Sequence, residues 1–286
     1  MTVHTQTAPV ERLAEFARQI RLDVLLQIKA AGSGHPGGSL SCADVMAVLF
    51  GYATDVAQLG TPVAVRDHVI LSKGHAAPAL YAALAGVGVI EPAELTTLRQ
   101  FGSRLQGHPD RTRLPEVEMS TGSLGQGLSV GCGLAWWLNR HAEPAIVYVV
   151  LGDGELDSGN TWEAISFAGA HPLRRLVAIV DANEMQNDGR VEDILDLRPY
   201  APKFAAFGWQ TREIDGNNIA DIVGAIDWVR SEPDRGPHVI IAHTTKGKGV
   251  SYMEGRREWH SHALDDAQYE AAVNELNDLG KAEAPQ

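Results

Sequence analysis

The sequence predicts an α/β fold of three layers, αβα, with a mostly parallel sheet between two layers of helices. Two continuous apolar runs, 145–151 and 176–180, show no alternation, as expected for strands that are covered on both faces. Between them, residues 160–170 have the pattern of a helix. Strand, helix and strand in succession form a βαβ unit with parallel strands and a right-handed crossover. The same rhythm returns later in the chain, so we expect an open parallel sheet wrapped by helices.

The other elements follow from local patterns along the chain. From Glu11 to Ala30, apolar residues recur at helical spacing, which predicts an amphipathic helix that ends at Gly32. The glycine-rich stretch 32–38 is expected to be a turn. The remaining expectations are a helix over 41–50, a strand over 69–71, a helix over 78–84, a glycine-rich start followed by an apolar helix over 122–137, a strand over 209–214, a helix over 219–229 and a strand over 238–242.

Length and composition favour one globular domain. With 286 residues, 44% of them hydrophobic and 21% charged, the chain can bury a sizeable core. We expect a single domain over 11–277 with loosely ordered termini at 1–10 and 278–286, although two compact domains would also fit this length. Cys42 and Cys132 lack metal-ligand spacing and are expected to be free buried thiols.

Charge and hydropathy exclude several classes of partner. The net charge of −12 argues against a nucleic-acid or anionic-membrane surface, because both would require clustered Lys and Arg. Residues 1–10 lack the basic and apolar regions of a signal peptide, and no later apolar run reaches the roughly 20 residues that span a bilayer. We therefore expect a cytoplasmic protein with no membrane partner and no nucleic-acid partner.

Polar segments follow both central strands directly: Gly-Asp-Gly-Glu after the first and Asp-Ala-Asn-Glu-Met after the second. If the strands are neighbours, Asp153 and Asn183 share one edge of the sheet and offer oxygen ligands that suit Mg²⁺ or Ca²⁺. Because Mg²⁺ often completes its coordination with substrate phosphates, the site favours a diphosphate. Gly152 and Gly154 would let the backbone approach that ligand closely. Taken alone, Gly-Asp-Gly is better explained by a tight turn, and only its context favours a site.

The segment from Gly152 to Asn183 resembles the signature shared by many enzymes that use thiamine diphosphate. The resemblance implies the diphosphate-binding domain of such enzymes. It also implies that Asp153, Asn183 and the main-chain carbonyl of Met185 hold a Mg²⁺ ion that bridges the diphosphate, with Ca²⁺ or Mn²⁺ able to replace it.

Further segments narrow the resemblance to the amino-terminal half of the transketolase family. They match that half in order and spacing over nearly the whole chain. They are Ser-Gly-His-Pro-Gly-Gly at 33–38, Leu-Ser-Lys-Gly-His-Ala at 71–76, Gly-His-Pro-Asp at 107–110, Ser-Thr-Gly-Ser-Leu-Gly-Gln-Gly at 120–127, Thr-Thr-Lys-Gly-Lys-Gly at 244–249 and Trp-His at 259–260. The resemblance implies cofactor contacts from His75, Gly122, Leu124, Gly125, Gly152, Asp153, Gly154, Glu155 and Asn183.

The transketolase resemblance implies catalytic roles for His35, His75, His108 and His260. The reaction passes a two-carbon ketol unit from a ketose to an aldose, and it requires groups that stabilise an oxyanion and move protons near neutral pH, as imidazole can. His75 would lie near the diphosphate and the reacting centre, and the other three would face substrate hydroxyls or assist proton transfer. Five further histidines are expected to be structural: His4, His68, His141, His171 and His238.

A full transketolase is more than twice as long as this chain. The resemblance therefore implies that the pyrimidine-binding domain, with its activating glutamate and most of the groups that bind a sugar phosphate, lies on a separate chain. We expect the isolated subunit to be inactive. It would act on a sugar or sugar phosphate only together with a C-terminal transketolase subunit. The two chains are expected to form an α2β2 heterotetramer.

One position departs from the family pattern. Ser158 stands where the family usually has a glutamate of the relay between paired active sites, and Glu155 or Asp157 are the residues that could compensate. Other functions stay open at this point: the α subunit of a 2-oxoacid dehydrogenase-type decarboxylase, half of a deoxyxylulose-phosphate synthase, or a non-catalytic cofactor-binding subunit. The histidine set argues against the 2-oxoacid enzyme, and Ser158 alone favours the non-catalytic subunit.

Overall fold

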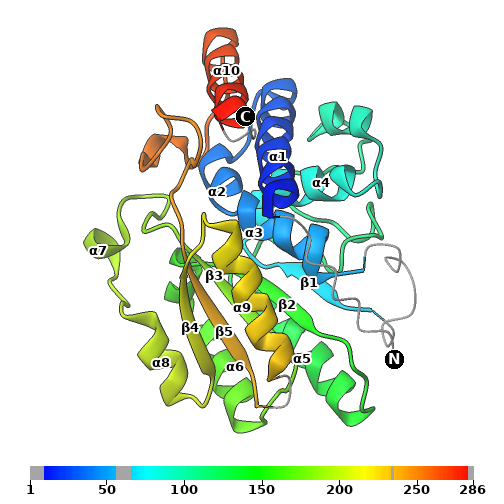
Figure 1. The fold of residues 1–286 in the computed structure, drawn as a ribbon, viewed down its shortest axis with the longest axis vertical. Coiled ribbons are helices and arrows are strands. Elements are labelled where there is room, and N and C mark those ends of the chain that lie inside the picture. Colours follow the sequence, from blue (N-terminus) through cyan, green and yellow to red (C-terminus); the bar gives the residue numbers. More distant parts are fainter. Residues whose placement is uncertain (1–9, 56–65, 233–234, 283–286) are drawn as a thin grey trace.

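The computed structural model of the chain describes residues 10–55, 66–232 and 235–282, and a parallel sheet of five strands lies at its centre (Figure 1). The strands are β1 (His68–Leu71), β2 (Val147–Gly152), β3 (Leu176–Ala182), β4 (Gln210–Asp215) and β5 (His238–His243). Their order across the sheet is β1-β2-β3-β5-β4, and every neighbouring pair is parallel. The predicted α/β fold and the parallel β2–β3 pair are thus confirmed.

The strands β2 and β3 are mostly apolar because alternate side chains enter two different cores. In β2, Val147, Val149 and Leu151 pack on one face, whereas Tyr148 and Val150 pack on the other. All five side chains are completely buried. The absence of alternation in the sequence is therefore the direct result of burial on both faces.

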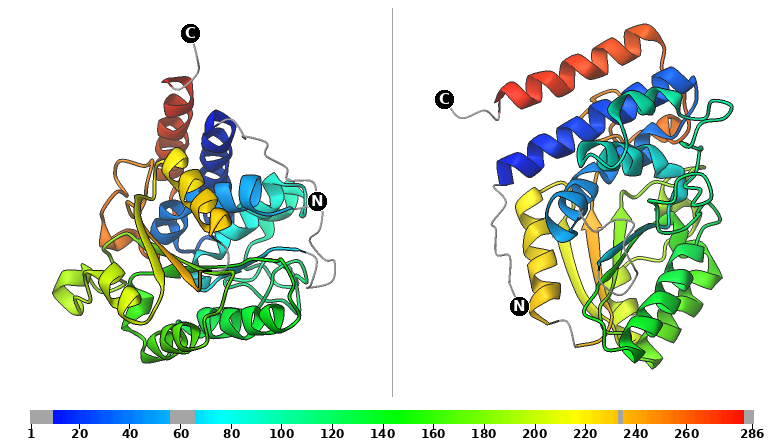
Figure 2. Two further views of the ribbon diagram at one scale, coloured as in Figure 1. Left: turned by 60° about the horizontal axis from the view of Figure 1, so that its bottom comes forward. Right: turned by 90° about the vertical axis from the view of Figure 1, so that its right-hand side faces the viewer.

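Two layers of helices cover the sheet (Figure 2). One face is covered by α1 (Val10–Ala31), α2 (Pro36–Ser41), α3 (Ala43–Val48), a π-helical turn (Leu49–Ala53), α4 (Ala77–Gly86) and α9 (Ile219–Ser231). The opposite face is covered by α5 (Gln126–Arg140), α6 (Gly159–Ala170) and α8 (Tyr200–Ala206). Beyond these layers lie α7 (Val191–Ile194) and α10 (Asp266–Ala282), and α10 packs along α1.

The glycine-rich stretch near residue 35 differs from its prediction. Residues 36–38 begin α2 and are not part of a turn, because Pro36 at the first helical position has a backbone angle suited to a helix. Gly37 and Gly38 are needed for close packing: an added Cβ would lie 2.8 Å from the Trp259 carbonyl oxygen at Gly37, and 3.2 Å from His75 Nε2 at Gly38. The glycines thus let α2 pack against the loops that carry two of the predicted catalytic histidines.

The C-terminal boundary also differs from the prediction. Helix α10 continues to Ala282, so residues 278–282, which were predicted to form a loosely ordered terminus, are helical. The neighbouring prediction for the N-terminus falls mainly on residues 1–9, which lie outside the described residues, and Val10 already belongs to α1. Helix α8 was not predicted either.

Two further expectations concern the cysteines and the membrane. Cys42 and Cys132 are free and buried, as predicted. None of the helices over the described ranges is long and apolar enough to cross a bilayer.

The strand order favours a ligand-binding crevice at the carboxyl edge of the sheet. The helix after β2 lies on one face, the helix after β4 lies on the other, and the order reverses between β3 and β5. The loops that leave β3 and β5 therefore diverge, and ligands of open parallel sheets bind at such a point.

Candidate active site

The loops after four neighbouring strands meet at this edge. They are residues 72–75 after β1, 153–157 after β2, 183–185 after β3 and 244–246 after β5. The predicted placement of Asp153 beside Asn183 is confirmed, because Gly152 pairs with Asp181 across the sheet and Asp153 N donates to Asp181 O at 3.3 Å.

Asp153 is a buried carboxylate held by main-chain amides. Its Oδ1 accepts from Gly154 N at 2.8 Å, and its Oδ2 accepts from Glu184 N at 2.6 Å. Burial and the neighbouring charge of Asp181 raise its pKa to about 7. An anionic group so poorly solvated favours a cation beside it, which is the property expected of a metal ligand.

Asn183 is oriented by a buried ion pair. Its Nδ2 donates to Asp181 Oδ2 at 3.1 Å and to Ser41 Oγ at 3.3 Å, which leaves Oδ1 on the opposite side of the amide. Lys73 Nζ binds the same Asp181 carboxylate and donates to Gly38 O at 2.9 Å. Although burial opposes charge on both groups, their contact holds the pKa of Lys73 above and that of Asp181 below its ordinary value.

Met185, the third predicted metal ligand, already has a cation on its carbonyl oxygen. Lys246 Nζ donates to Met185 O at 3.3 Å, so an ammonium group lies where the predicted set would bind an ion. The described residues contain no cluster of three His, Cys, Asp or Glu suited to a metal. A carboxylate, an amide oxygen and a carbonyl oxygen nevertheless form the mixed oxygen set that Mg²⁺ accepts when phosphate oxygens complete it. The residues present therefore fit such an ion.

The predicted cofactor-contact residues surround this crevice, with one exception. A Cβ added at Gly154, Gly122 or Gly125 would lie within 3.2 Å of a neighbouring side chain. Gly122 and Gly125 also have positive φ angles, of 151° and 83°. Leu124 is 36% exposed beside them. Glu155 is the exception, because its buried carboxylate accepts hydrogen bonds from three other segments of the protein.

The carboxylate of Glu155 connects three segments of the site. It accepts from Ser72 Oγ, from Gly125 N at 2.6 Å and from Gly152 N at 3.1 Å. Glu155 therefore positions the start of α5 against the ends of β1 and β2. Its direct contact with the cofactor stays a prediction, and the structure shows a positioning role for its carboxylate.

The residues named for the missing relay have partners within the chain. Ser158 is half-buried at the start of α6, and Glu155 accepts from the donors just described. Asp157 accepts from Gln186 Nε2 at 2.6 Å. Compensation for the family's glutamate by either carboxylate stays a prediction.

The four predicted catalytic histidines form one cluster. The ring centroids of His75 and His260 are 5.2 Å apart, those of His35 and His75 are 5.4 Å apart, and those of His35 and His260 are 5.6 Å apart. His108 lies at the edge, with its centroid 6.2 Å from that of His35. His35 and His260 are about 225 positions apart in the sequence, and the fold brings them together as predicted.

All four imidazoles are neutral at neutral pH. Burial, with help from Arg99, lowers the pKa of His35 to about 4, and burial with help from Lys246 lowers that of His260 to about 3. Burial also lowers the pKa of His75 and of His108. The cluster therefore offers hydrogen-bond donors and acceptors, and it does not offer imidazolium acids.

Two cations that were not predicted contact the cluster. Lys246 Nζ lies 2.8 Å from His260 Nδ1, and Arg99 Nη2 lies 3.4 Å from His35 Nδ1. Burial, with the nearby charge of Lys73, lowers the pKa of Lys246 to about 8. The Lys-Gly repeat at 246–249 was a usable signal for Lys246, whereas nothing in the local sequence around Arg99 points to the site.

The histidines expected to be structural have other surroundings. His68 Nδ1 lies 3.0 Å from Glu118 at the start of β1, and His238 at the start of β5 packs against Trp228. His141 contacts the Trp137 carbonyl oxygen, and His171 packs on Trp136. His4 lies outside the described residues.

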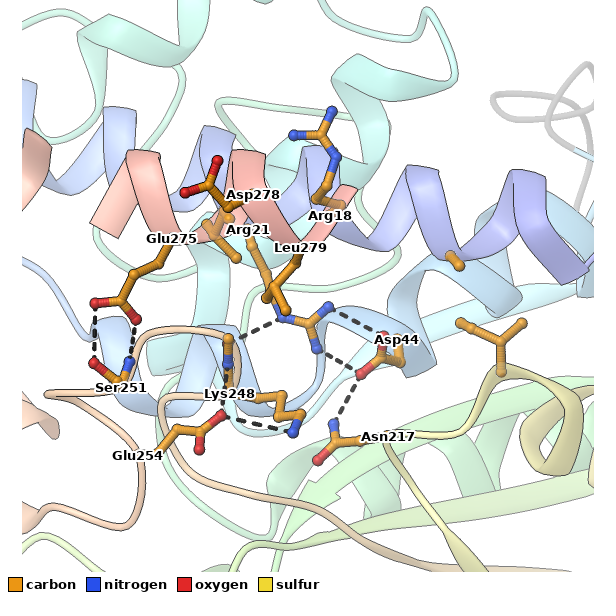
Figure 3. Close-up of a pocket in the computed structure, with 14 residues that line it drawn as sticks. Arg18, Arg21, Asp44, Asn217, Lys248, Ser251, Glu254, Glu275, Asp278 and Leu279 are labelled. Atoms are coloured by element: carbon orange, nitrogen blue, oxygen red, sulfur yellow. Dashed lines mark hydrogen bonds and ion pairs between the residues drawn. The ribbon is translucent and has the colours of Figure 1, made fainter. Parts of the chain in front are cut away.

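A cavity of about 760 Å³ lies away from the histidine cluster, between α1, α10 and the loops after β4 and β5 (Figure 3). Arg21 at its floor pairs with Asp44 at 2.5 Å and donates to Lys248 O at 3.1 Å, and Asn217 Nδ2 donates to Asp44 at 2.8 Å. These polar groups already satisfy one another. We interpret the cavity as the space behind the loop that carries Lys246.

A family model for "Transketolase, thiamine diphosphate binding domain" matches residues 12–278. The chain belongs to the transketolase family. Members of this family are thiamine diphosphate-dependent transferases, and the matching domain is the one that binds the cofactor. The resemblance drawn from the sequence motifs is thereby confirmed, including the assignment to the amino-terminal half.

Two relatives are single subunits of similar length. The 6-deoxy-6-sulfo-D-fructose transketolase subunit SqwG of Clostridium sp. (strain MSTE9) is 40% identical over 268 residues, covering 94% of this chain and 97% of the relative. A subunit of the apulose-4-phosphate transketolase of Phocaeicola vulgatus is 38% identical, covering 96% of this chain and 95% of the relative.

Single-chain transketolases are matched over less than half of their length. The mouse transketolase is 37% identical over 93% of this chain, which spans 42% of that protein. The crystal structure of the Campylobacter jejuni transketolase superposes with a TM-score of 0.81 at 28% identity, over 94% of this chain and again 42% of its own. The similarity thus covers one part of the whole transketolase.

Proposed function

We propose that this chain is the thiamine-diphosphate-binding subunit of a two-chain transketolase. In this proposal it transfers a two-carbon ketol unit from a ketose to an aldose once a C-terminal subunit completes the site. The observation that carries the proposal is the cluster of His35, His75, His108 and His260 beside the Asp153–Asn183 edge. The two subunit relatives, matched over nearly their full length, support the division into two chains.

The oxygen set and the small residues of the crevice suit a Mg²⁺-bound diphosphate. Asp153, Asn183 and the Met185 carbonyl would hold the ion, and Gly122, Leu124, Gly125 and Gly154 would admit the cofactor. When bound, thiamine diphosphate supplies the electron sink for carbon–carbon bond cleavage. Lys73 and Lys246 add positive charge where the diphosphate would carry negative charge.

The histidines act on the sugar as neutral groups. A neutral imidazole donates one hydrogen bond and accepts another, so the cluster can bind hydroxyls of the ketose and donate to the oxygen that becomes negative when its carbonyl is attacked. Within the described ranges, no hydrogen bond is made by the ring nitrogens of His75 or His108, and the Tyr81 hydroxyl binds the His108 main-chain oxygen. The ring nitrogens are therefore available to a ligand. Positive charge on Arg99 and Lys246 strengthens such donors.

The substrate class is proposed as a ketose that carries an anionic group. The two relatives are named for a sulfonated ketose and for a ketose phosphate, respectively. Both names describe a polyhydroxylated chain ending in a strong anion. A sugar-binding partner subunit would contribute the groups that recognise that anion.

The partner subunit is proposed to dock on the exposed apolar face of α5 and α6. Val130, Trp137 and Phe167 are each more than 40% exposed on these adjacent helices. An added Cβ at Gly133, on the same side of α5, would meet no atom within 4 Å. The face continues toward Leu124 at the crevice, so a chain bound there would reach the site. Two copies of each chain would form the proposed α2β2 heterotetramer.

Ketol transfer tests the proposal. The chain alone and the chain co-purified with the subunit from the adjacent gene are given thiamine diphosphate, Mg²⁺, xylulose 5-phosphate as donor and ribose 5-phosphate as acceptor, with 6-deoxy-6-sulfo-D-fructose as a second donor. We expect transfer only by the pair. Transfer by the isolated chain would contradict the two-chain requirement. A pair that oxidises 2-oxoacids, or that binds the cofactor without turnover, would contradict transketolase activity.

A further inference from the structure

Arg99 contacts both a catalytic-cluster histidine and the loop that carries it. Its Nη2 lies 3.4 Å from His35 Nδ1, and its Nη1 donates to Ser33 Oγ at 3.1 Å. A guanidinium group has only donors and stays protonated in proteins. His35 Nδ1 must therefore be the acceptor in this contact, which places the ring hydrogen of a neutral His35 on Nε2.

The loop around Arg99 fixes the guanidinium in this position. Arg99 has a φ of 61°, which is uncommon for a residue other than glycine, and its N donates to Leu105 O at 2.8 Å. A Cβ added at Gly107 would lie 2.8 Å from Arg99 Nε. The strained backbone and the missing side chain at Gly107 together direct Arg99 toward His35. Arg104, in the same loop, pairs instead with Glu94 at 3.1 Å.

We propose that Arg99 is a positioning residue that fixes His35 in the Nε2–H tautomer, so that His35 presents a hydrogen-bond donor to the ketose. The nature of the ligand rests on the proposed function, whereas the tautomer does not. His35 Nε2 finds no acceptor among the described residues. Its hydrogen is therefore available to a hydroxyl or to a developing oxyanion.

The opposite tautomer would serve the reaction poorly. With its hydrogen on Nδ1, His35 would turn a lone pair at Nε2 toward the substrate and would also face the Arg99 donors with a hydrogen. The first arrangement repels an oxyanion and the second is electrostatically unfavourable. Burial and the Arg99 charge, which lower the pKa of His35 to about 4, exclude the doubly protonated ring near neutral pH.

Lys246 provides an internal reference. Its Nζ lies 2.8 Å from His260 Nδ1, an arrangement like that of Arg99 and His35 but from a different loop. Removal of Arg99 should change the tautomer of His35 and leave that of His260 as it was.

Imidazole ¹⁵N NMR on the isolated chain, labelled at histidine, tests the proposal without cofactor, partner or substrate. The His35 signals are assigned by their loss in His35→Gln. We expect wild-type His35 to show the Nε2–H pattern alone, and Arg99→Met to show a mixture in which the Nδ1–H form is readily detected. Arg99→Lys should restore the Nε2–H form at least in part. Arg104→Met, which removes an arginine of the same loop that pairs with Glu94, should leave the pattern unchanged.

Three results would overturn the proposal: an Nδ1–H or doubly protonated His35 in the wild type at pH 7, an unchanged His35 pattern in Arg99→Met, or an equal change in Arg104→Met. Arg99→Gln gives the same comparison if Arg99→Met does not fold. In the active pair, Arg99→Met should lower kcat by about 10-fold or more with little change in KM, as expected for a lost oxyanion donor. A normal tautomer result with no ketol transfer by the pair would refute the proposed function alone.

Discussion

The residues of the site combine buried charge with hydrogen-bond geometry that is already complete on the protein side. Asp153, Asn183 and Glu155 each have their remaining polar atoms bound to main-chain or side-chain partners. Such support holds the ligating groups in place before any ligand arrives. In this arrangement Asp153 and the histidines are poorly solvated. Single substitutions at these positions should therefore change ligand binding and the pH dependence of stability.

Replacement of Asp153 by alanine should abolish metal-dependent binding of thiamine diphosphate. The substitution removes the only carboxylate of the proposed oxygen set, so the affinity should fall by more than about 100-fold. Isothermal titration calorimetry of the chain with Mg²⁺ present measures this. Asp193→Ala, on the exposed helix α7, is the matched control, and unchanged affinity in Asp153→Ala would disprove the proposed site.

The buried histidines should make the chain sensitive to acid. Their pKa values are lowered in the folded state, so the unfolded chain binds more protons between about pH 4 and 6.5, and stability should fall as the pH falls through that window. His260→Gln should reduce the proton uptake on unfolding near pH 5 by about one. Denaturant titrations at pH 7 and pH 5 measure the difference, and an equal pH dependence in wild type and variant would contradict it. His141→Gln, at an exposed ring, is the control.

At the scale of elements, the loop of residues 244–249 is held from behind by α1. Arg21 on α1 pairs with Asp44 and donates to the Lys248 carbonyl oxygen (Figure 3). This contact fixes the loop whose other side presents Lys246 to Met185 and His260. Helix α1 thus helps to position the Lys246 ammonium group in the site.

Arg21→Met should destabilise the chain by about 3 kcal/mol, because it leaves Asp44 buried with only Asn217 as a partner. The double variant Arg21→Met, Asp44→Leu should recover much of that loss, since no charge is then left unpaired. Chemical denaturation measures both. A single variant as stable as wild type would show that Asp44 is well solvated without Arg21.

The elements that the sequence predicted best are those whose burial pattern is local. The apolar runs at 145–151 and 176–180 became β2 and β3 within two residues at each end, and α1 and α9 followed their helical spacing. The start of α2 was missed because Gly37 and Gly38 signal a turn locally, while their real constraint is the approach of Trp259 and His75 from distant segments.

The contrast between local patterns and constraints from distant segments also applies to the site. The four histidines and the Asp153–Asn183 pair stand in short motifs, and the structure brings them together. Arg99 does not stand in such a motif, and its role depends on a left-handed backbone and on space left by Gly107. The direction of the Glu155 carboxylate was missed for a similar reason, since its donors come from three separate segments.

At the scale of the whole molecule, the proposed function gives this chain one side of a two-chain site. The loops of that site lie at the carboxyl edge of the sheet, and α5 and α6 carry exposed apolar side chains. A partner that covers this face would bury apolar surface, which stabilises the complex, and would exclude water from the site, which favours catalysis.

Charge placed on this face should prevent assembly without unfolding the chain. Trp137→Glu and Phe167→Glu change side chains that are 41% exposed, so the isolated variants should fold normally but should no longer co-purify with the partner subunit. Size-exclusion chromatography with light scattering measures assembly. Leu279→Glu, at a 48% exposed position on α10, is the matched control, and retention of the complex by both first variants would exclude this face.

The ammonium group on the Met185 carbonyl has a consequence for the proposed metal site. Lys246 Nζ donates to the oxygen that would bind Mg²⁺, so the ion would compete with this ammonium group for Met185 O. A small shift of the Lys246 side chain would admit the ion and would leave the ammonium group beside the diphosphate. Without the ion, the same ammonium group places a positive charge near the buried carboxylates of Asp153 and Asp181.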